Sequence, residues 1–211
     1  LPCCLRPGRV GGRQKGQPVT VHVARGPAAL TASGREFYPL SPSVDAIAIE
    51  DIAHALAHQC RFNGHTRVFY SIAEHCVSVS RLCAPEDALW GLLHDAAEAY
   101  LGDLIAPVKY LPDLWAYRDL EARVLQVIAE AFSLELPIPS SVATADNWML
   151  QIELRALLPM PATWHCALPE EISRLLLATT IAPLPPEPAR AAFLQRFEAL
   201  TGTRVADGSV A

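Results

Sequence analysis

Apolar residues recur at steps of three and four positions through most of the chain beyond Ile49, with polar residues between them. This spacing is typical of amphipathic α-helices that bury one face. It predicts helices over residues 49–60, 70–82, 91–104, 114–131, 140–158, 170–179 and 187–200. Gly102 and Gly202 follow the last periodic residues of two of these segments, where a helix can end on a left-handed residue. We therefore expect an all-α fold.

The chain before these helices has a different pattern. Valine alternates with other residues over 19–23, which indicates a short strand, and Ser33-Gly34 can form a turn between residue 30 and residues 37–38. We expect at most a small β-hairpin here. The predicted organisation is a basic, Gly- and Pro-rich arm with a possible short hairpin over residues 1–45, a helical domain over 46–203, and a frayed tail over 204–211.

The charge is distributed unevenly along the chain. Residues 1–26 hold five basic residues and no acidic ones, so subtracting their +5 from the net charge of −5 leaves −10 for the rest. Such an arm can contact nucleic acid, but a solvated tail is the favoured interpretation. The negative net charge argues against a generally basic surface for nucleic acid.

Neither a membrane span nor a disulfide framework is indicated. No apolar run reaches the roughly 18–20 residues that a span requires, and no clear signal peptide is present at the start. Of the six cysteines, Cys60, Cys76 and Cys83 fall in or at the ends of amphipathic helices, which favours buried free thiols. We expect a cytoplasmic protein.

Candidate chemistry is concentrated in residues 91–104, which read GLLHDAAEAYLGDL. His94 and Asp95 are adjacent, Glu98 lies four residues after His94 on the same helical face, and Asp103 follows Gly102. Ionisable groups on an apolar helix are costly unless a metal ion or other partners satisfy them. Each residue also has an ordinary interpretation: a hydrogen-bonded core histidine, a solvent-facing Asp95, or Asp103 as the cap of the next helix.

Two further residues with ligand-type side chains lie on other predicted helices. His75 is on or next to the buried face of 70–82, and Asp146 falls on the apolar face of 140–158, where an unpaired carboxylate is costly. Three separate helices thus bring His, His-Asp and Asp toward one core.

This order and its surroundings resemble the HD superfamily of metal-dependent phosphohydrolases, most closely the bacterial 5'-deoxynucleotidase branch and its phage-type relatives. The resemblance covers about residues 49–155 and implies an HD-domain helical bundle. His-Asp alone is a weak signal, whereas the long HDAAEAYLGDL phrase with its flanking residues is strong. The matching phrases are Ala73-Glu74-His75, His94-Asp95-Ala96-Ala97-Glu98, Gly102-Asp103-Leu104, Pro107-Val108-Lys109-Tyr110 and Ala145-Asp146.

The resemblance also implies a metal centre. One divalent ion would be held by the mixed nitrogen and oxygen ligands His75, His94, Asp95 and Asp146. Such a set suits Mn, Co, Zn, Fe, Ni or Mg. Glu98 is the candidate to orient or deprotonate the attacking water, and Asp103 the candidate to assist proton transfer, although these two catalytic roles are interchangeable.

A substrate-binding loop is implied upstream of the first metal ligand. In the nucleotidase branch an arginine followed by an aromatic residue precedes the metal histidine, and Arg61-Phe62 takes that place. The spacing from Arg61 to His75 is one residue shorter than in that branch, and Phe62 stands where it has Trp. A forked guanidinium suits phosphate. His65 would contact substrate or order the loop, and Lys109 completes the predicted substrate-binding set.

One other histidine pair has a spacing that metal sites use. His54 and His58 are four residues apart, on one face of the predicted helix over 49–60. No further ligand accompanies them in the sequence, so surface imidazoles are the favoured interpretation.

The predicted function is a metal-dependent phosphoric ester hydrolase that releases phosphate from nucleotides, most simply from 5'-deoxynucleoside monophosphates. One alternative is a deoxynucleoside triphosphate triphosphohydrolase, and another is a non-catalytic helical regulatory module that keeps a metal. The expected partner is a small nucleotide rather than a membrane or a nucleic-acid polymer, and a homodimer is left open.

Overall fold

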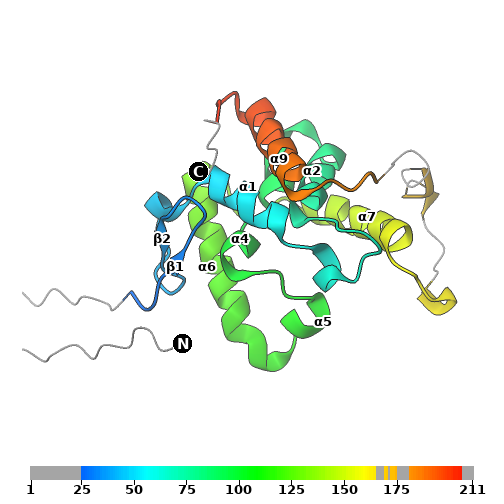
Figure 1. The fold of residues 1–211 in the computed structure, drawn as a ribbon, viewed down its shortest axis with the longest axis horizontal. Helices are drawn as coiled ribbons and strands as arrows, with labels where there is room; N and C mark the ends of the chain where they lie inside the picture. The colour runs from blue at the N-terminus through cyan, green and yellow to red at the C-terminus, as the bar shows by residue number, and fades with distance from the viewer. Residues whose placement is uncertain (1–24, 165–168, 171, 175–180, 206–211) are drawn as a thin grey trace, which may run out of the picture.

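The computed structural model describes residues 25–164, 169–170, 172–174 and 181–205. Within these residues the fold is mainly helical, with one small antiparallel sheet near the N-terminal end (Figure 1). The predicted predominance of helices and the predicted hairpin are therefore confirmed. The strand expected over 19–23 and much of the helix expected over 170–179 lie outside the described residues.

The hairpin is fixed to the helical domain through one aspartate. Strand β1 (Ala29–Leu30) pairs antiparallel with β2 (Glu36–Phe37), with Ala29 opposite Phe37. The turn between them contains Gly34 at φ +81°, a conformation that glycine adopts at no steric cost. Ser33 donates hydrogen bonds from its backbone nitrogen and its hydroxyl to the buried Asp51 carboxylate, at 2.7 and 2.8 Å.

Helix α2 (Ile72–Leu82) has neighbouring helices packed around it. Its first turn is held by a capping box, in which Glu74 N donates to the Ser71 hydroxyl and Ser71 N donates to the Glu74 carboxylate. This box fixes the backbone at His75, the next residue. The helices packed against α2 are α1 (Ile49–His58), α3 (Ala88–Leu93), α7 (Ser140–Leu157) and α9 (Pro186–Thr201).

Shorter elements connect these helices, and one further long helix, α6 (Trp115–Ala131), flanks the domain (Figure 1). As predicted, α9 ends at Gly202, which is left-handed at φ +70°. The remaining elements are η1 (Val44–Ala46), η2 (Arg61–Gly64), η3 (Pro85–Asp87), α4 (Glu98–Leu101), α5 (Ala106–Lys109), η4 (Pro112–Leu114) and η5 (Ala162–Trp164).

The main core joins the hairpin to the helices. Phe37 of β2 is completely buried and its ring centroid lies 4.4 Å from that of Tyr100. Burying a side chain of this size contributes about 1.5–3 kcal/mol, so the short hairpin is held by packing as well as by Asp51. The other large side chains that are fully buried in this cluster are Ile52, Leu56, Ile72, Leu92, Leu93, Ile128 and Phe193.

The helix predicted over residues 91–104 is interrupted at its chemical centre. Helix α3 ends at Leu93, residues 94–97 form turns, and α4 begins at Glu98. Backbone hydrogen bonds here span three residues instead of four: Ala96 N to Leu93 O, Glu98 N to Asp95 O and Ala99 N to Ala96 O. Such tight turns often mark functional segments. Gly102 then ends α4 at φ +82° and ψ 153°, outside the left-handed helical region.

The described chain also bears on the predictions about membranes and cysteines. No helix in it combines the length and the hydropathy needed to cross a bilayer. Cys60, Cys76 and Cys83 are free thiols, as expected, but only Cys76 is buried.

Candidate metal centre

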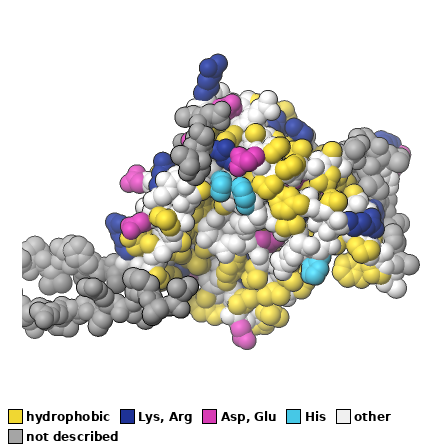
Figure 2. All heavy atoms as spheres, in the orientation of Figure 1, with side chains coloured by type: hydrophobic (Ala, Val, Ile, Leu, Met, Phe, Trp, Pro, Cys, Tyr) yellow, Lys and Arg dark blue, Asp and Glu magenta, His cyan; other side chains and the backbone are white. Residues whose placement is uncertain are grey.

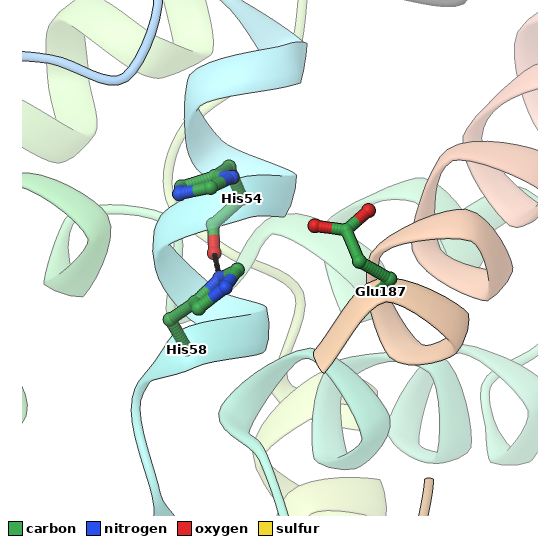
Figure 3. A group of neighbouring side chains, drawn as sticks. All are labelled: His54, His58 and Glu187. Carbon is green, nitrogen blue, oxygen red and sulfur yellow. Dashed lines mark hydrogen bonds between the residues drawn. The ribbon is translucent and has the colours of Figure 1, made fainter. Parts of the chain in front are cut away.

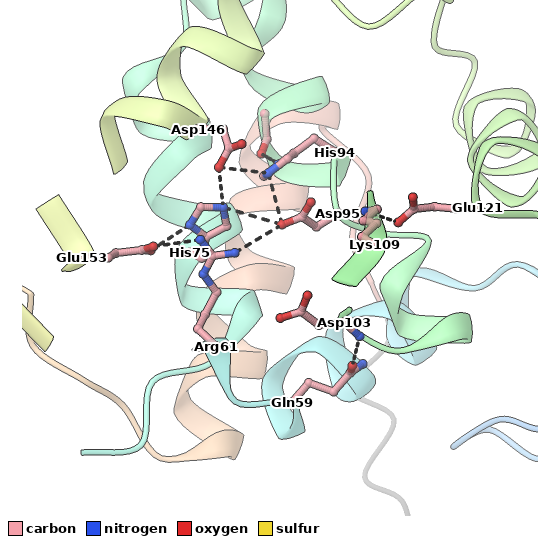
Figure 4. Close-up of polar contacts among 11 residues, drawn as sticks. Gln59, Arg61, His75, His94, Asp95, Asp103, Lys109, Glu121, Asp146 and Glu153 are labelled. Carbon is pink, nitrogen blue, oxygen red and sulfur yellow. Dashed lines mark hydrogen bonds and ion pairs between the residues drawn. The ribbon is translucent and has the colours of Figure 1, made fainter. Parts of the chain in front are cut away.

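Side chains from three parts of the chain meet at one point (Figure 4). His75 comes from α2, His94 and Asp95 from the turn after α3, and Asp146 from α7. His75 Nε2 lies 3.1 Å from Asp146 Oδ1 and 3.6 Å from Asp95 Oδ2. His94 Nε2 lies 3.2 Å from Asp95 Oδ2 and 4.0 Å from Asp146 Oδ1. The structure thus brings together all four residues predicted as metal ligands.

These separations fit a single small cation. Metal bonds to imidazole nitrogen and carboxylate oxygen are about 2.0–2.2 Å long, so neighbouring ligand atoms around one ion lie about 3.0–3.4 Å apart. Two of the four separations, 3.1 and 3.2 Å, match this spacing, and the other two, 3.6 and 4.0 Å, are slightly longer. His75, His94 and Asp146 offer ligand atoms within 4.8 Å of one another, which is compatible with a divalent metal ion.

The tautomers of the two histidines provide a test of this fit. His94 Nδ1 lies 2.9 Å from the Gly91 carbonyl oxygen, and because a carbonyl can only accept, this nitrogen carries the proton. His75 Nδ1 lies 2.7 Å from Glu153 Oε1 and donates to this carboxylate in the same way. Both Nε2 atoms therefore face the acidic oxygens, and each presents a lone pair to them when its ring is neutral. They are buried without a hydrogen-bond partner in the described chain, and a cation between them satisfies both.

The electrostatics of the cluster also favour an added positive charge. Burial and the Arg61 charge lower the pKa of His75, but the carboxylates of Glu153 and Asp146 outweigh them and raise it to about 9. Burial raises the pKa of Asp95, yet the neighbouring imidazoles and guanidinium hold it well below its usual range. The centre therefore holds ionised carboxylates, and a cation there would compete with a proton for His75.

Arg61 reaches the same centre from η2. Its Nη2 donates to Glu153 Oε2 at 2.9 Å, and its Nη1 lies 3.8 Å from Asp95 Oδ2. Arg61 Nε is buried and has no hydrogen-bond partner among the described residues, so this N–H donor is left unsatisfied. Phe62, at φ +53°, lies against this guanidinium with 5.3 Å between its ring centroid and Cζ. A left-handed aromatic residue is uncommon and often accompanies a functional site.

The two candidate catalytic acids lie next to the cluster and share a positioning residue. Gln59 Nε2 donates to the Glu98 carbonyl at 3.0 Å, and Asp103 N donates to Gln59 Oε1 at 3.1 Å. Glu98 is almost completely buried, and burial together with the charges of Asp95 and Asp103 raises its pKa strongly. Burial also raises the pKa of Asp103.

The other two predicted substrate-binding residues, Lys109 and His65, lie in different surroundings. Lys109 lies near the cluster, but its Nζ is 2.5 Å from Glu121 Oε1, so its charge is already paired (Figure 4). His65 lies on the exposed part of the loop after η2, and no hydrogen bond joins its ring to the cluster in the described chain.

Sequence reasoning missed three residues of the site. Glu153 is completely buried and links His75 to Arg61. Gln59 holds the segment that carries the two acids. Cys76 offers a sulfur within 4.8 Å of ligand atoms of His94 and Asp95. The available signal for Glu153 was its position seven residues after Asp146, two helical turns along the same face.

Two proteins are similar to this chain over most of their lengths. YfdR from Escherichia coli (strain K12) is 39% identical over 176 residues, which are 82% of this chain and 96% of YfdR. RCAP_rcc00048 from Rhodobacter capsulatus is 35% identical over 184 residues, covering 80% of this chain and 92% of that protein. No family model matches the sequence. The similarity to YfdR spans nearly all of that protein, and the chain therefore belongs to the same family as YfdR.

Proposed function

We propose that this chain is a divalent-metal-dependent phosphohydrolase acting on nucleotides, most simply on 5'-deoxynucleoside monophosphates. The observation that carries the proposal is the pair of buried Nε2 atoms, on His75 and His94, that face the carboxylates of Asp95 and Asp146. These four residues would hold the ion. The likeness of the HDAAEAYLGDL segment to the HD phosphohydrolases supplies the substrate class.

The surroundings of the cluster favour turnover over a purely structural ion. Structural metal sites are closed by protein ligands, whereas catalytic sites keep an open position. The Asp146 side chain is 42% exposed and that of Asp95 is 20% exposed, so solvent and substrate can approach from this side. Arg61, Glu98 and Asp103 also lie here, and a structural ion requires none of them.

Each group has a chemical task in the proposed reaction. A bound divalent ion would polarise the phosphoryl group and lower the pKa of a water molecule. Arg61, held by Glu153, would direct its remaining N–H donors at phosphate oxygens, where charge develops as the bond to the leaving group breaks. Phe62 beside it would contact the nucleoside.

Proton transfer would fall to Glu98 and Asp103. Burial and the charges of Asp95 and Asp103 raise the pKa of Glu98 to about 10, so this carboxyl stays protonated near neutral pH and suits a group that donates a proton to the leaving 5'-oxygen. Burial also raises the pKa of Asp103. A cation at the cluster would lower both values, and the residue that then loses its proton would accept one from the attacking water. Gln59 keeps the two acids at a fixed spacing.

The test is phosphate release from a panel of nucleotides with each of Mn²⁺, Co²⁺, Zn²⁺, Ni²⁺ and Mg²⁺. We expect orthophosphate from deoxynucleoside monophosphates. Asp95→Ala should abolish release with loss of the ion, and Glu98→Gln should reduce it by about 10²–10⁴-fold with the ion retained. Glu130→Gln, on the exposed face of α6, is the matched control. Tripolyphosphate from dATP would instead assign a triphosphohydrolase, and no hydrolysis by the metal-loaded protein would contradict the proposal.

A further inference from the structure

A second group of ligand-type side chains lies on the surface between α1 and α9. His54 and His58 belong to α1, and Glu187 belongs to the first turn of α9 (Figure 3). Figure 2 shows two histidine side chains gathered beside an acidic one on the face formed by these helices. The sequence contains the histidine pair but gives no hint of its third member, because Glu187 lies 129 residues after His58 (187 − 58).

The geometry of the group is close to that of a chelate. One ligand atom from each of the three residues lies within 4.8 Å of the other two. The imidazole rings of His54 and His58 are stacked, with centroids 4.2 Å apart and planes 26° apart, so both project on the same side of α1. Figure 3 shows the Glu187 carboxylate facing these rings across the space between the helices.

The hydrogen bonds of the two histidines leave nitrogen lone pairs available. His58 Nδ1 lies 2.8 Å from the backbone carbonyl oxygen of His54, which can only accept, so Nδ1 carries the proton and Nε2 a lone pair. A backbone carbonyl that fixes the tautomer in this way is a usual companion of metal-binding histidines. For His54, the described residues provide no hydrogen-bond partner to either ring nitrogen.

We propose that His54, His58 and Glu187 form a second divalent-metal site, separate from the centre around His75, that takes a borderline ion such as Zn²⁺ or Ni²⁺. The i, i+4 histidine pair and a carboxylate are ligands that such ions prefer. Around one zinc ion the ligand atoms lie about 3.4 Å apart, so from separations of at most 4.8 Å the side chains must approach by at most about 1.4 Å. His58 and Glu187 are exposed, so solvent and not packed side chains surrounds the atoms that must move.

One existing contact opposes this arrangement. Arg190 Nη1 lies 3.6 Å from Glu187 Oε2. The Glu187 side chain is 68% exposed, whereas that of Arg190 is only 11% exposed. Glu187 would exchange the guanidinium for the metal ion, and the loss of this contact lowers the net affinity of the site.

The site would act as a clamp between the two ends of the helical domain. Helices α1 and α9 pack against each other, although α1 begins the domain and α9 ends it. An ion bound to both helices in the folded state alone would raise the ratio of folded to unfolded protein by about 100-fold at a free concentration 100 times its Kd.

Zinc uptake by the full chain tests the proposal, measured by equilibrium dialysis and by thermal unfolding. We expect His58→Ala to lose one equivalent of Zn²⁺, and Glu187→Gln to weaken this equivalent by about 10-fold or more. Each variant should also lose the zinc-dependent rise in unfolding temperature that this site provides. Asp95→Ala should lose a different equivalent, which separates this site from the proposed catalytic centre.

Two matched variants control for nonspecific uptake. His65→Ala removes another exposed histidine, and Glu86→Gln another exposed carboxylate; both should bind zinc as the unaltered chain does. Equal zinc stoichiometry and affinity in His58→Ala and the unaltered chain would overturn the proposal. So would an equal loss in His58→Ala and His65→Ala, because that result means scattered surface binding.

Discussion

His75 Nδ1 lies 2.7 Å from Glu153 Oε1, and both side chains are completely buried. This contact ties α2 to α7 at the centre of the candidate site. It fixes Nδ1 of His75 as a proton donor to Glu153, and so directs Nε2 at Asp95 and Asp146. The second oxygen of Glu153 accepts from Arg61 at 2.9 Å, so one carboxylate orients both a metal ligand and a phosphate-binding candidate.

Glu153→Gln should weaken divalent-ion binding without unfolding the protein. The glutamine oxygen can still accept from His75 Nδ1, but the negative charge that makes the imidazole a stronger ligand is lost. Changes to such supporting residues typically cost about 10–100-fold in metal affinity. Isothermal titration with Mn²⁺ or Zn²⁺ measures the effect, and Glu130→Gln on the exposed side of α6 is the control. Equal affinities in Glu153→Gln and the unaltered chain would show that Glu153 does not support the metal site.

Glu153 illustrates why the sequence yields only part of the site. Its neighbours Met149 and Ile152 form the predicted apolar stripe of α7, and they are buried as expected. A glutamate beside such a stripe usually reaches solvent with its long side chain. Its burial depends on His75, from a helix far away in the sequence, and no local pattern encodes that approach.

The interruption between α3 and α4 has a similar origin. Amphipathic spacing predicted a helix through His94 and Asp95, because Leu92, Leu93, Ala96 and Ala97 all face the core. The change to three-residue hydrogen bonds depends on how this segment packs, which periodicity does not report. Helices were therefore predictable from local pattern, whereas their exact ends and the buried polar contacts were not. The assigned roles of the site residues remain predictions.

The metal-free protein should be most stable in mildly acidic solution. The pKa of His75 is raised from 6.5 to about 9. The protonated imidazole therefore stabilises the folded state fully below pH 6.5, and this stabilisation is lost as the pH rises through 9. The raised pKa of Glu98 likewise contributes stability that is lost as the pH rises. The lowered pKa of Asp95 contributes stability that is lost only as the pH falls below 3.8. Urea unfolding with a chelator, at about pH 6 and about pH 9, should therefore give the lower midpoint at the higher pH.

A bound divalent ion should prevent this loss of folding stability at alkaline pH. The ion replaces the proton at the cluster, so its binding becomes stronger as His75 deprotonates. With excess Mn²⁺ the unfolding midpoint should hardly change between the two pH values. A midpoint that falls equally with and without Mn²⁺ would show that the ion does not bind at His75.

Arg61 should contribute to the stability of the fold as well as to the proposed binding of substrate. Removing one partner of a buried ion pair costs about 3–5 kcal/mol, so Arg61→Ala should lower the free energy of unfolding by about this amount. Arg61→Lys keeps a charge but loses the fork that faces Glu153 and Asp95, and a smaller loss is expected. Arg123→Ala breaks an exposed pair with Asp119 and should cost at most about 1 kcal/mol. Similar losses in Arg61→Ala and Arg123→Ala would contradict the buried role of Arg61.

Gln59→Ala separates positioning from metal binding. The variant loses the bonds to the Glu98 carbonyl and the Asp103 nitrogen, but it touches none of the four candidate ligands. Under the proposed function, displaced acids should lower kcat for phosphate release by about 10–100-fold, while KM and metal affinity change little. Gln126→Ala, exposed on α6, is the control. Loss of metal binding in Gln59→Ala would instead mean that the loop supports the ligands.

Gly91→Ala should destabilise the fold although it adds a better helix former to α3. A Cβ at this position would lie 2.7 Å from Cys83 Sγ and 3.0 Å from Ser80 Cα, where α3 crosses α2. Alanine gains about 1 kcal/mol of helix propensity, whereas overpacking costs about 1–3 kcal/mol. The cost should prevail because the Ser80 contact is with backbone and α2 must shift to relieve it.

The Gly91 carbonyl also accepts from His94 Nδ1, so the same shift should weaken metal binding. Urea unfolding measures the first effect. Adding Cys83→Ala should recover only part of the loss, because the Ser80 clash persists. If Gly91→Ala alone were as stable as the unaltered chain, this would show that α2 and α3 can move apart freely.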